Sequence, residues 1–152
     1  MKEPLVSRYL RYALYVVFAL GVAGTVTLPF MLDFYMIFLY DAYSLRSGYR
    51  LFITLFLMGV AVPGLWIVLE MIWMLRSIPE GPFVARNVRA LNRSGIILMI
   101  MAAAFFGKCF LYVTIMSLAA GLLLVICGLF AFTLGNLFGQ AVAFREENDL
   151  TI

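Results

Sequence analysis

The sequence predicts an all-α integral membrane protein that crosses the bilayer four times. Hydrophobic residues make up 65% of the 152-residue chain and charged residues only 12%, against about 25% charged residues in ordinary soluble domains. So few polar side chains cannot coat a water-soluble surface, and the bilayer must therefore solvate most of the chain. Three long stretches that contain almost no charge set the number of crossings: residues 12–32, 51–69 and 94–144.

The lengths of these stretches predict how the crossings are divided. A transmembrane helix needs about 20 apolar residues, so each of the first two stretches matches one helix. The third contains a single charged residue, Lys108, and is long enough for a hairpin of two helices with a turn near residues 114–118. We expect one domain over residues 1–152, a four-helix bundle. Its helices are expected at residues 8–32, 51–75, 94–112 and 118–144.

The distribution of lysine and arginine predicts the orientation, because cytoplasmic loops carry an excess of these residues. If both termini are cytoplasmic, the outer loop, residues 33–50, contains only Arg46 and Arg50, and Lys108 lies nearer that side. The loop 76–93 and the tail 145–152 are then also cytoplasmic. These cations flank apolar stretches, which favours contact with anionic lipid headgroups over direct binding of nucleic acid. The inner side contains Lys2, Arg8, Arg11, Arg76, Arg86, Arg89, Arg93 and Arg145.

The inner loop is predicted to contain a short amphipathic helix that leads into the third transmembrane helix. Gly81 and Pro82 favour a helix start there, because proline suits the first helical position. Apolar residues and arginines then recur on different faces. The basic face is expected to contact lipid headgroups, and docking of a cytosolic protein is the alternative. The apolar face comprises Val84, Val88 and Leu91, and the basic face comprises Arg86, Arg89 and Arg93.

Two segments resemble a known family. Residues 82–91, Pro-Phe-Val-Ala-Arg-Asn-Val-Arg-Ala-Leu, followed by Gly95, resemble the cytoplasmic-loop motif of a bacterial four-helix membrane family catalogued as domain of unknown function 2975. The ending, residues 147–152, is similar to that family's carboxyl terminus. Members are often encoded beside a small helix-turn-helix DNA-binding protein, so the resemblance implies a bacterial membrane partner for a transcription regulator. The residues expected to bind that partner are Phe83, Arg86, Asn87, Arg89, Arg93, Asn148 and Asp149.

Lys108 is the charged side chain expected deepest in the outer half of the membrane. A lysine in mid-membrane costs roughly 2.5–3.5 kcal/mol on insertion scales, which makes it a candidate functional residue. The simpler expectation is that its long side chain reaches the outer interface, toward Asp33 or Asp41, or makes a structural pair.

Glu70 is expected near the inner membrane surface, at the same depth as Asn136 and Gln140 of the fourth helix. Arg76 follows it closely in the sequence. We expect an inner-edge hydrogen-bonding cluster here. A proton-coupled carboxylate is the alternative, although transport carboxylates usually lie nearer the midplane.

Four glycines in the fourth helix recur at spacings that place them along one stripe. Small residues at such spacings allow helices to approach closely. Packing within the bundle is the preferred interpretation, and contact with a second copy in a homo-oligomer is the alternative. The glycines are Gly121, Gly128, Gly135 and Gly139.

Residues that carry chemistry are scarce in this chain. It contains no histidine, which removes the usual zinc sites, histidine-ligated haem and histidine acid–base catalysis. Cys109 and Cys127 lie in apolar stretches, where they could face each other across the hairpin as inert thiols. We therefore expect no enzymatic activity, no catalytic residue, no metal and no cofactor.

Two functions follow from these observations. The first is a non-enzymatic membrane protein that regulates or tethers a cytosolic helix-turn-helix transcription regulator. The second is a small oligomeric transporter or channel that uses Lys108 or Glu70.

Overall fold

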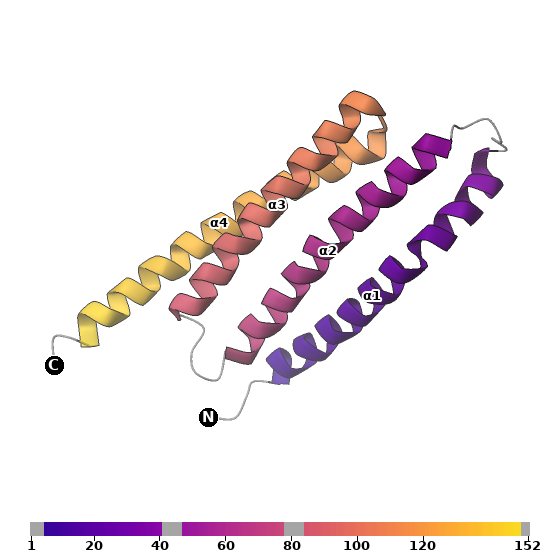
Figure 1. Cartoon of the computed structure of the whole chain (residues 1–152). Coiled ribbons are helices and arrows are strands. Elements are labelled where there is room, and N and C mark those ends of the chain that lie inside the picture. The colour runs from indigo at the N-terminus through magenta and orange to yellow at the C-terminus, as the bar shows by residue number, and fades with distance from the viewer. Residues whose placement is uncertain (1–4, 41–46, 78–83, 150–152) are drawn as a thin grey trace.

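The computed structural model describes residues 5–40, 47–77 and 84–149, and these residues form four long α-helices and no strand. Each helix is long and apolar enough to cross a membrane. The predicted all-α architecture with four membrane-spanning helices is therefore confirmed. The helices are α1 (Leu5–Tyr40), α2 (Ser47–Ser77), α3 (Ala85–Leu111) and α4 (Ile115–Asp149) (Figure 1).

The four helices lie in a row in chain order, and each runs antiparallel to the one before it (Figure 1). The contact between α3 and α4 is the most extensive, followed by that between α1 and α2, and then that between α2 and α3. We call the end where α1 and α3 begin the terminal end, and the opposite end, which holds the α3–α4 turn, the turn end. The molecule thus consists of two helical hairpins joined along α2 and α3.

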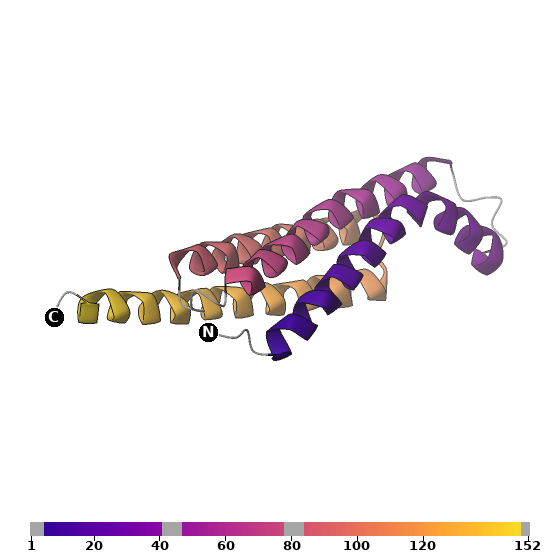
Figure 2. The ribbon, with the colours of Figure 1, turned by 90° about the horizontal axis from the view of Figure 1, so that it is seen from below.

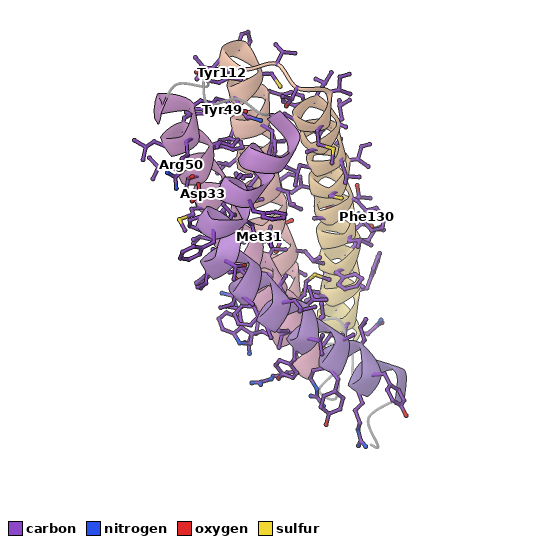
Figure 3. The ribbon with its side chains drawn as sticks, turned by 90° about the vertical axis from the view of Figure 1, so that its right-hand side faces the viewer. Met31, Asp33, Tyr49, Arg50, Tyr112 and Phe130 are labelled. Atoms are coloured by element: carbon purple, nitrogen blue, oxygen red, sulfur yellow. The ribbon has the colours of Figure 1, made fainter. Side chains whose placement is uncertain are left out.

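Apolar side chains cover the outside of this row of helices. None of the described large side chains is fully buried, whereas Phe30 of α1 is 76% exposed and Phe130 of α4 is 64% exposed. Figure 3 shows Phe130 on the outer side of its helix. Lipid tails solvate such side chains as well as a protein core does, so the helices are held together by close packing and polar contacts.

The helix α1 is longer than predicted and continues through Pro29 to Tyr40. Proline lacks the N–H that would bond to the carbonyl one turn earlier, at Thr25, and so favours a bend. The hydroxyl of Thr25 donates to the Gly21 carbonyl at 2.8 Å, a contact that also bends helices. Figure 2 shows that α1 bends in its second half.

Much of the predicted outer loop, residues 33–50, is helical, because α1 ends at Tyr40 and α2 begins at Ser47. The two helices are linked at the turn end by an ion pair, in which Arg50 Nη2 lies 2.6 Å from Asp33 Oδ2 (Figure 3). Asp33 therefore pairs with Arg50 and not with Lys108.

The predicted amphipathic helix is the first part of α3, which runs without a break from Ala85 to Leu111. Val84, with extended backbone angles, precedes it. The third transmembrane helix was predicted to start at Ser94, where the charges end. A single helix can begin with a basic segment and continue as an apolar one. The last arginine, Arg93, therefore does not mark the start of the helix.

The turn between α3 and α4 comprises residues 112–114 and lies earlier than the predicted 114–118. The carbonyl of Thr114 accepts the N–H groups of Ser117 and Leu118 at 3.0 and 3.1 Å. Threonine is favoured immediately before a helix, and this signal locates the turn even though the segment lacks Pro, Asn and Asp. At its other end α4 continues to Asp149, so most of the expected tail, residues 145–152, is helix.

Candidate functional site

The glycine stripe of α4 faces α3 along the whole hairpin. A Cβ atom added to Gly128 would lie 3.1 Å from Met99 Sδ and 3.4 Å from the carbonyl oxygen of Gly95. Such short distances favour glycine, because a large side chain here would hold the helices apart. The stripe therefore packs inside the hairpin. The corresponding partners are Phe106 for Gly121, Asn92 for Gly135 and Val88 for Gly139.

The way in which α3 and α4 are aligned by these glycine contacts separates the two cysteines. Gly128 is opposite Met99, so Cys127 lies level with the middle of α3, whereas Cys109 lies near the turn. The expectation that Cys109 and Cys127 face each other is wrong, because the turn, residues 112–114, is closer to Cys109 than the predicted turn at 114–118. Both thiols are free, and Cys127 is exposed.

Lys108 is buried beside the α3–α4 turn and is only 8% exposed. Its Nζ donates to Ser117 Oγ at 2.6 Å and to Thr114 Oγ1 at 3.4 Å. The two hydroxyl groups also bond to each other at 2.6 Å. The expected partner Asp33 is wrong, because Asp33 pairs with Arg50, and Asp41 lies outside the described residues. The expected structural pair is present instead, because the turn places two acceptors within reach of Lys108. The partners of Lys108 that the structure describes are thus two hydroxyl oxygens and not a carboxylate.

Aromatic rings line the side of α3 that faces α2 near Lys108. The ammonium lies 5.7 Å from the centre of the Phe56 ring, within the range of a cation–π contact. Phe56 in turn packs edge-on against Phe105 with ring centres 5.1 Å apart. Closer to the turn end, the rings of Tyr49 and Tyr112 meet at 4.7 Å (Figure 3). This cluster was not predicted from the sequence, although Phe105 and Tyr112 are spaced to share one helix face.

Glu70 is buried on α2 near the terminal end, and its Oε1 accepts a hydrogen bond from Arg93 Nη1 at 2.8 Å. The Glu70 side chain is 7% exposed and that of Arg93 is 55% exposed. The predicted cluster with Asn136, Gln140 and Arg76 is wrong. The helix α4 packs against α3, and Asn136 and Gln140 are exposed on it, whereas Glu70 of α2 is bonded to Arg93 of α3.

Arg76 instead links α2 to α1. Its Nε donates to the hydroxyl oxygen of Tyr15 at 3.1 Å, and its Nη2 donates to the same atom. The guanidinium carbon lies 5.8 Å from the centre of the Tyr15 ring. The first helix is thereby fixed to the second at the terminal end.

Asn87 joins the end of α2 to the start of α3. It is buried, and its Oδ1 accepts a hydrogen bond from Ser77 Oγ at 2.9 Å. The prediction that Asn87 contacts a partner protein is therefore wrong, because its side chain lies inside the molecule. Arg93 is bonded to Glu70, but its side chain is 55% exposed, so its assignment to partner binding stays a prediction.

The other predicted partner-binding residues have varied positions. Arg86 and Arg89 are exposed on the first turns of α3, and Asn148 is exposed on the last turn of α4. Asp149 ends α4, but its side chain lies outside the described part of the chain, as does Phe83. The final turns of α4 extend beyond the start of α3 (Figures 1 and 2). The exposed members of the set therefore lie at the terminal end.

An open hollow of about 260 Å³ lies between the end of α2 and the start of α3 at the terminal end. Trp73, Arg76, Ser77 and Arg86 line it. Two guanidinium groups beside an indole give it an electropositive and partly apolar lining. Among the described residues, no three His, Cys, Asp or Glu side chains gather closely enough to hold a metal ion.

Four long apolar helices, with their ion pairs near the helix ends, define a multi-pass membrane protein. The family model described as "Protein of unknown function (DUF2975)" matches residues 35–152. Because this match covers most of the chain, the protein belongs to that family, as the loop and carboxyl-terminal motifs indicated. No curated protein and no solved structure matches the chain.

Proposed function

We propose that this is a non-enzymatic protein of the bacterial cytoplasmic membrane that tethers or regulates a cytosolic helix-turn-helix transcription regulator. The observation that supports this proposal best is the exposed polar surface at the terminal end. There, Arg89 on α3 is exposed, and the end of α4, which carries exposed Glu147 and Asn148, extends past it (Figure 1). The family resemblance supplies the expected class of partner.

The proposal requires the terminal end to face the cytoplasm. The charge distribution supports this orientation, because the terminal end carries most of the arginines and the turn end carries Arg50, which is paired with Asp33. Cytoplasmic loops are the ones enriched in lysine and arginine. A charged, solvent-exposed surface is also suited to steering a soluble partner, because complementary charges increase the rate of encounter.

Capture of the regulator by the full-length protein tests this function. Membranes that contain the tagged protein are expected to retain the purified helix-turn-helix protein encoded beside its gene. Arg89→Glu is expected to weaken retention about tenfold or more, because it replaces an attractive contact with a repulsive one. Binding is measured from the fraction retained as the regulator concentration is raised.

Arg8→Glu is the matched control, since Arg8 is an exposed arginine at the same end but on α1. It should leave retention unchanged. Equal loss in the Arg8 and Arg89 variants would show only a general effect of charge, and no retention by the unaltered protein would contradict the tethering function.

A small oligomeric transporter or channel is the second candidate, and the buried ammonium of Lys108 is the observation that favours it. An intramembrane cation held by two hydroxyl groups is a reasonable site for a passing anion. Glu70 is less suited to this role, because it lies near the terminal end and is bonded to Arg93.

Anion flux into proteoliposomes tests this candidate. If Lys108 carries transport, Lys108→Met should abolish a flux that the unaltered protein supports. The variant should still fold, because the Thr114 and Ser117 hydroxyls remain bonded to each other and the methionine fills a similar space. Flux that is the same with and without the lysine would eliminate Lys108 as a transport residue.

A further inference from the structure

The hollow at the terminal end combines charged donors from two helices. Arg76 is in the last turn of α2, and Arg86 is in the first turn of α3. Ser77 is buried and bonded to Asn87, so the two helix ends that carry the arginines are held at a fixed separation. The lining of the hollow is thus supported by a defined polar contact.

The arginines retain the capacity to bind a further acceptor. A guanidinium has five N–H donors, and Arg76 uses its Nε and Nη2 toward the single hydroxyl oxygen of Tyr15. The other N–H donors of the Arg76 guanidinium do not take part in the contact with Tyr15. Arg86 is exposed and also lines the hollow. Two guanidinium groups that face one space are suited to the bidentate recognition of a phosphate.

The electrostatics of this region also favour an anion. The first turn of α3 contains no acidic residue, and no side chain caps it. Arginines at a helix start oppose the helix dipole, which favours negative charge there. The helices α2 and α3 together contain one acidic residue, Glu70, and that carboxylate is bonded to Arg93. Neither helix therefore supplies a carboxylate that could neutralise Arg76 and Arg86, and Glu80, in the segment between the two helices, lies outside the described residues.

The surroundings of the hollow indicate a lipid and not a soluble phosphate. Trp73 lines the hollow, and its ring packs edge-on against that of Trp66 with ring centres 6.2 Å apart. Both rings are partly exposed on the outside of α2. They form an apolar surface that leads from the hollow along the membrane-spanning helix, and tryptophan is enriched at this depth. An acyl chain attached to a phosphate in the hollow could lie along these rings.

We propose that this hollow binds the phosphate group of an anionic phospholipid, with Arg76 and Arg86 holding the phosphate and the Trp73–Trp66 surface contacting an acyl chain. The site is separate from the tethering function, since it concerns a lipid and not a protein. It is more specific than general attraction of basic loops to the membrane, because it assigns two of the arginines to one binding site.

Tryptophan fluorescence of the purified full-length protein tests this site. The chain contains two tryptophans, so Trp66→Phe leaves Trp73 as the only reporter and keeps an aromatic ring in the acyl-chain surface. In nonionic detergent, dioctanoyl phosphatidylglycerol is expected to change this fluorescence saturably. Dioctanoyl phosphatidylcholine and inorganic phosphate are each expected to require a concentration about tenfold higher or more, because the first has no net charge and the second has no acyl chain.

Two variants and one matched control assign the signal to the hollow. Arg86→Gln and Arg76→Gln should each weaken the binding of phosphatidylglycerol about tenfold or more, because each removes charge-assisted hydrogen bonds. Arg89→Gln removes the same charge one turn further along α3, outside the lining, and should change binding by less than about twofold. Circular dichroism and gel filtration establish that each variant is folded.

Three outcomes would overturn the proposal. The first is a fluorescence change that does not saturate, and the second is equal weakening by Arg89→Gln and Arg86→Gln. The third is saturation by inorganic phosphate at the same concentration as the lipid, which would identify a site for soluble phosphate. The assay contains no partner protein, so its failure is distinguishable from failure of the tethering function.

Discussion

Replacement of Gly128 by leucine is expected to separate α3 from α4 and to lower the free energy of unfolding by about 1–3 kcal/mol. Even a Cβ atom at this position would lie 3.4 Å from the Gly95 carbonyl oxygen, and Met99 closes the remaining space. The methionine side chain can move, but the backbone of α3 can yield only if the helices move apart. Reversible unfolding in mixed micelles with increasing dodecyl sulfate, followed by circular dichroism, measures the loss.

Gly139→Ala is the matched control on the same stripe. Its Cβ atom would lie 3.7 Å from Val88 Cγ1, which is an ordinary contact. We expect a change of less than about 0.5 kcal/mol. If Gly128→Leu were as stable as this control, the close approach of the two helices at Gly128 would be contradicted.

The second large effect is expected at the ion pair between α2 and α3. Arg93→Ala leaves the carboxylate of Glu70 buried without its guanidinium partner, a situation that costs about 3–5 kcal/mol when both partners are buried. Arg93 is 55% exposed, so water partly screens the pair, and we expect a loss of about 2 kcal/mol. The same unfolding titration measures it.

The opposite single variant should cost much less. Glu70→Leu removes the buried charge and leaves an arginine that can extend into water. The double variant should therefore recover most of the stability that Arg93→Ala loses. Equal losses in the two single variants, or no recovery in the double variant, would contradict the unequal burial of the two side chains.

The membrane-spanning helices could be predicted from the sequence because a long uncharged apolar stretch can be recognised without knowing which helices are neighbours. Their ends could not be predicted as well. The segment with Arg86, Arg89 and Arg93 was predicted as a short amphipathic helix, and the third membrane-spanning helix was predicted to begin only at Ser94, whereas the structure has one continuous helix from Ala85. The position of the α3–α4 turn depended on a weak signal, the threonine that precedes α4.

The candidate site residues were predicted less completely than the fold. The spacing of the glycines indicated one packed face of α4, since that property belongs to a single helix. Lys108 and Glu70 were recognised as unusual, but their partners depend on which helices are neighbours. Because the helices form a row, Glu70 meets Arg93 of α3 and not Asn136 of α4. The hollow lined by Arg76 and Arg86 could not be predicted, since it requires two helix ends to come together.

The arrangement of the helices in a row determines where the two hairpins can rotate against each other most easily. The seam between α2 and α3 is less extensive than the contact within either hairpin, so a rotation of one hairpin against the other disrupts the fewest contacts when it occurs there. Near the terminal end, α2 and α3 are joined by the Ser77–Asn87 hydrogen bond and the Glu70–Arg93 ion pair. Toward the turn end they are joined by contacts between aromatic rings. A molecule bound at the terminal end would therefore act on the polar contacts between α2 and α3, and a small displacement there would become a larger displacement at the turn end of the long helices.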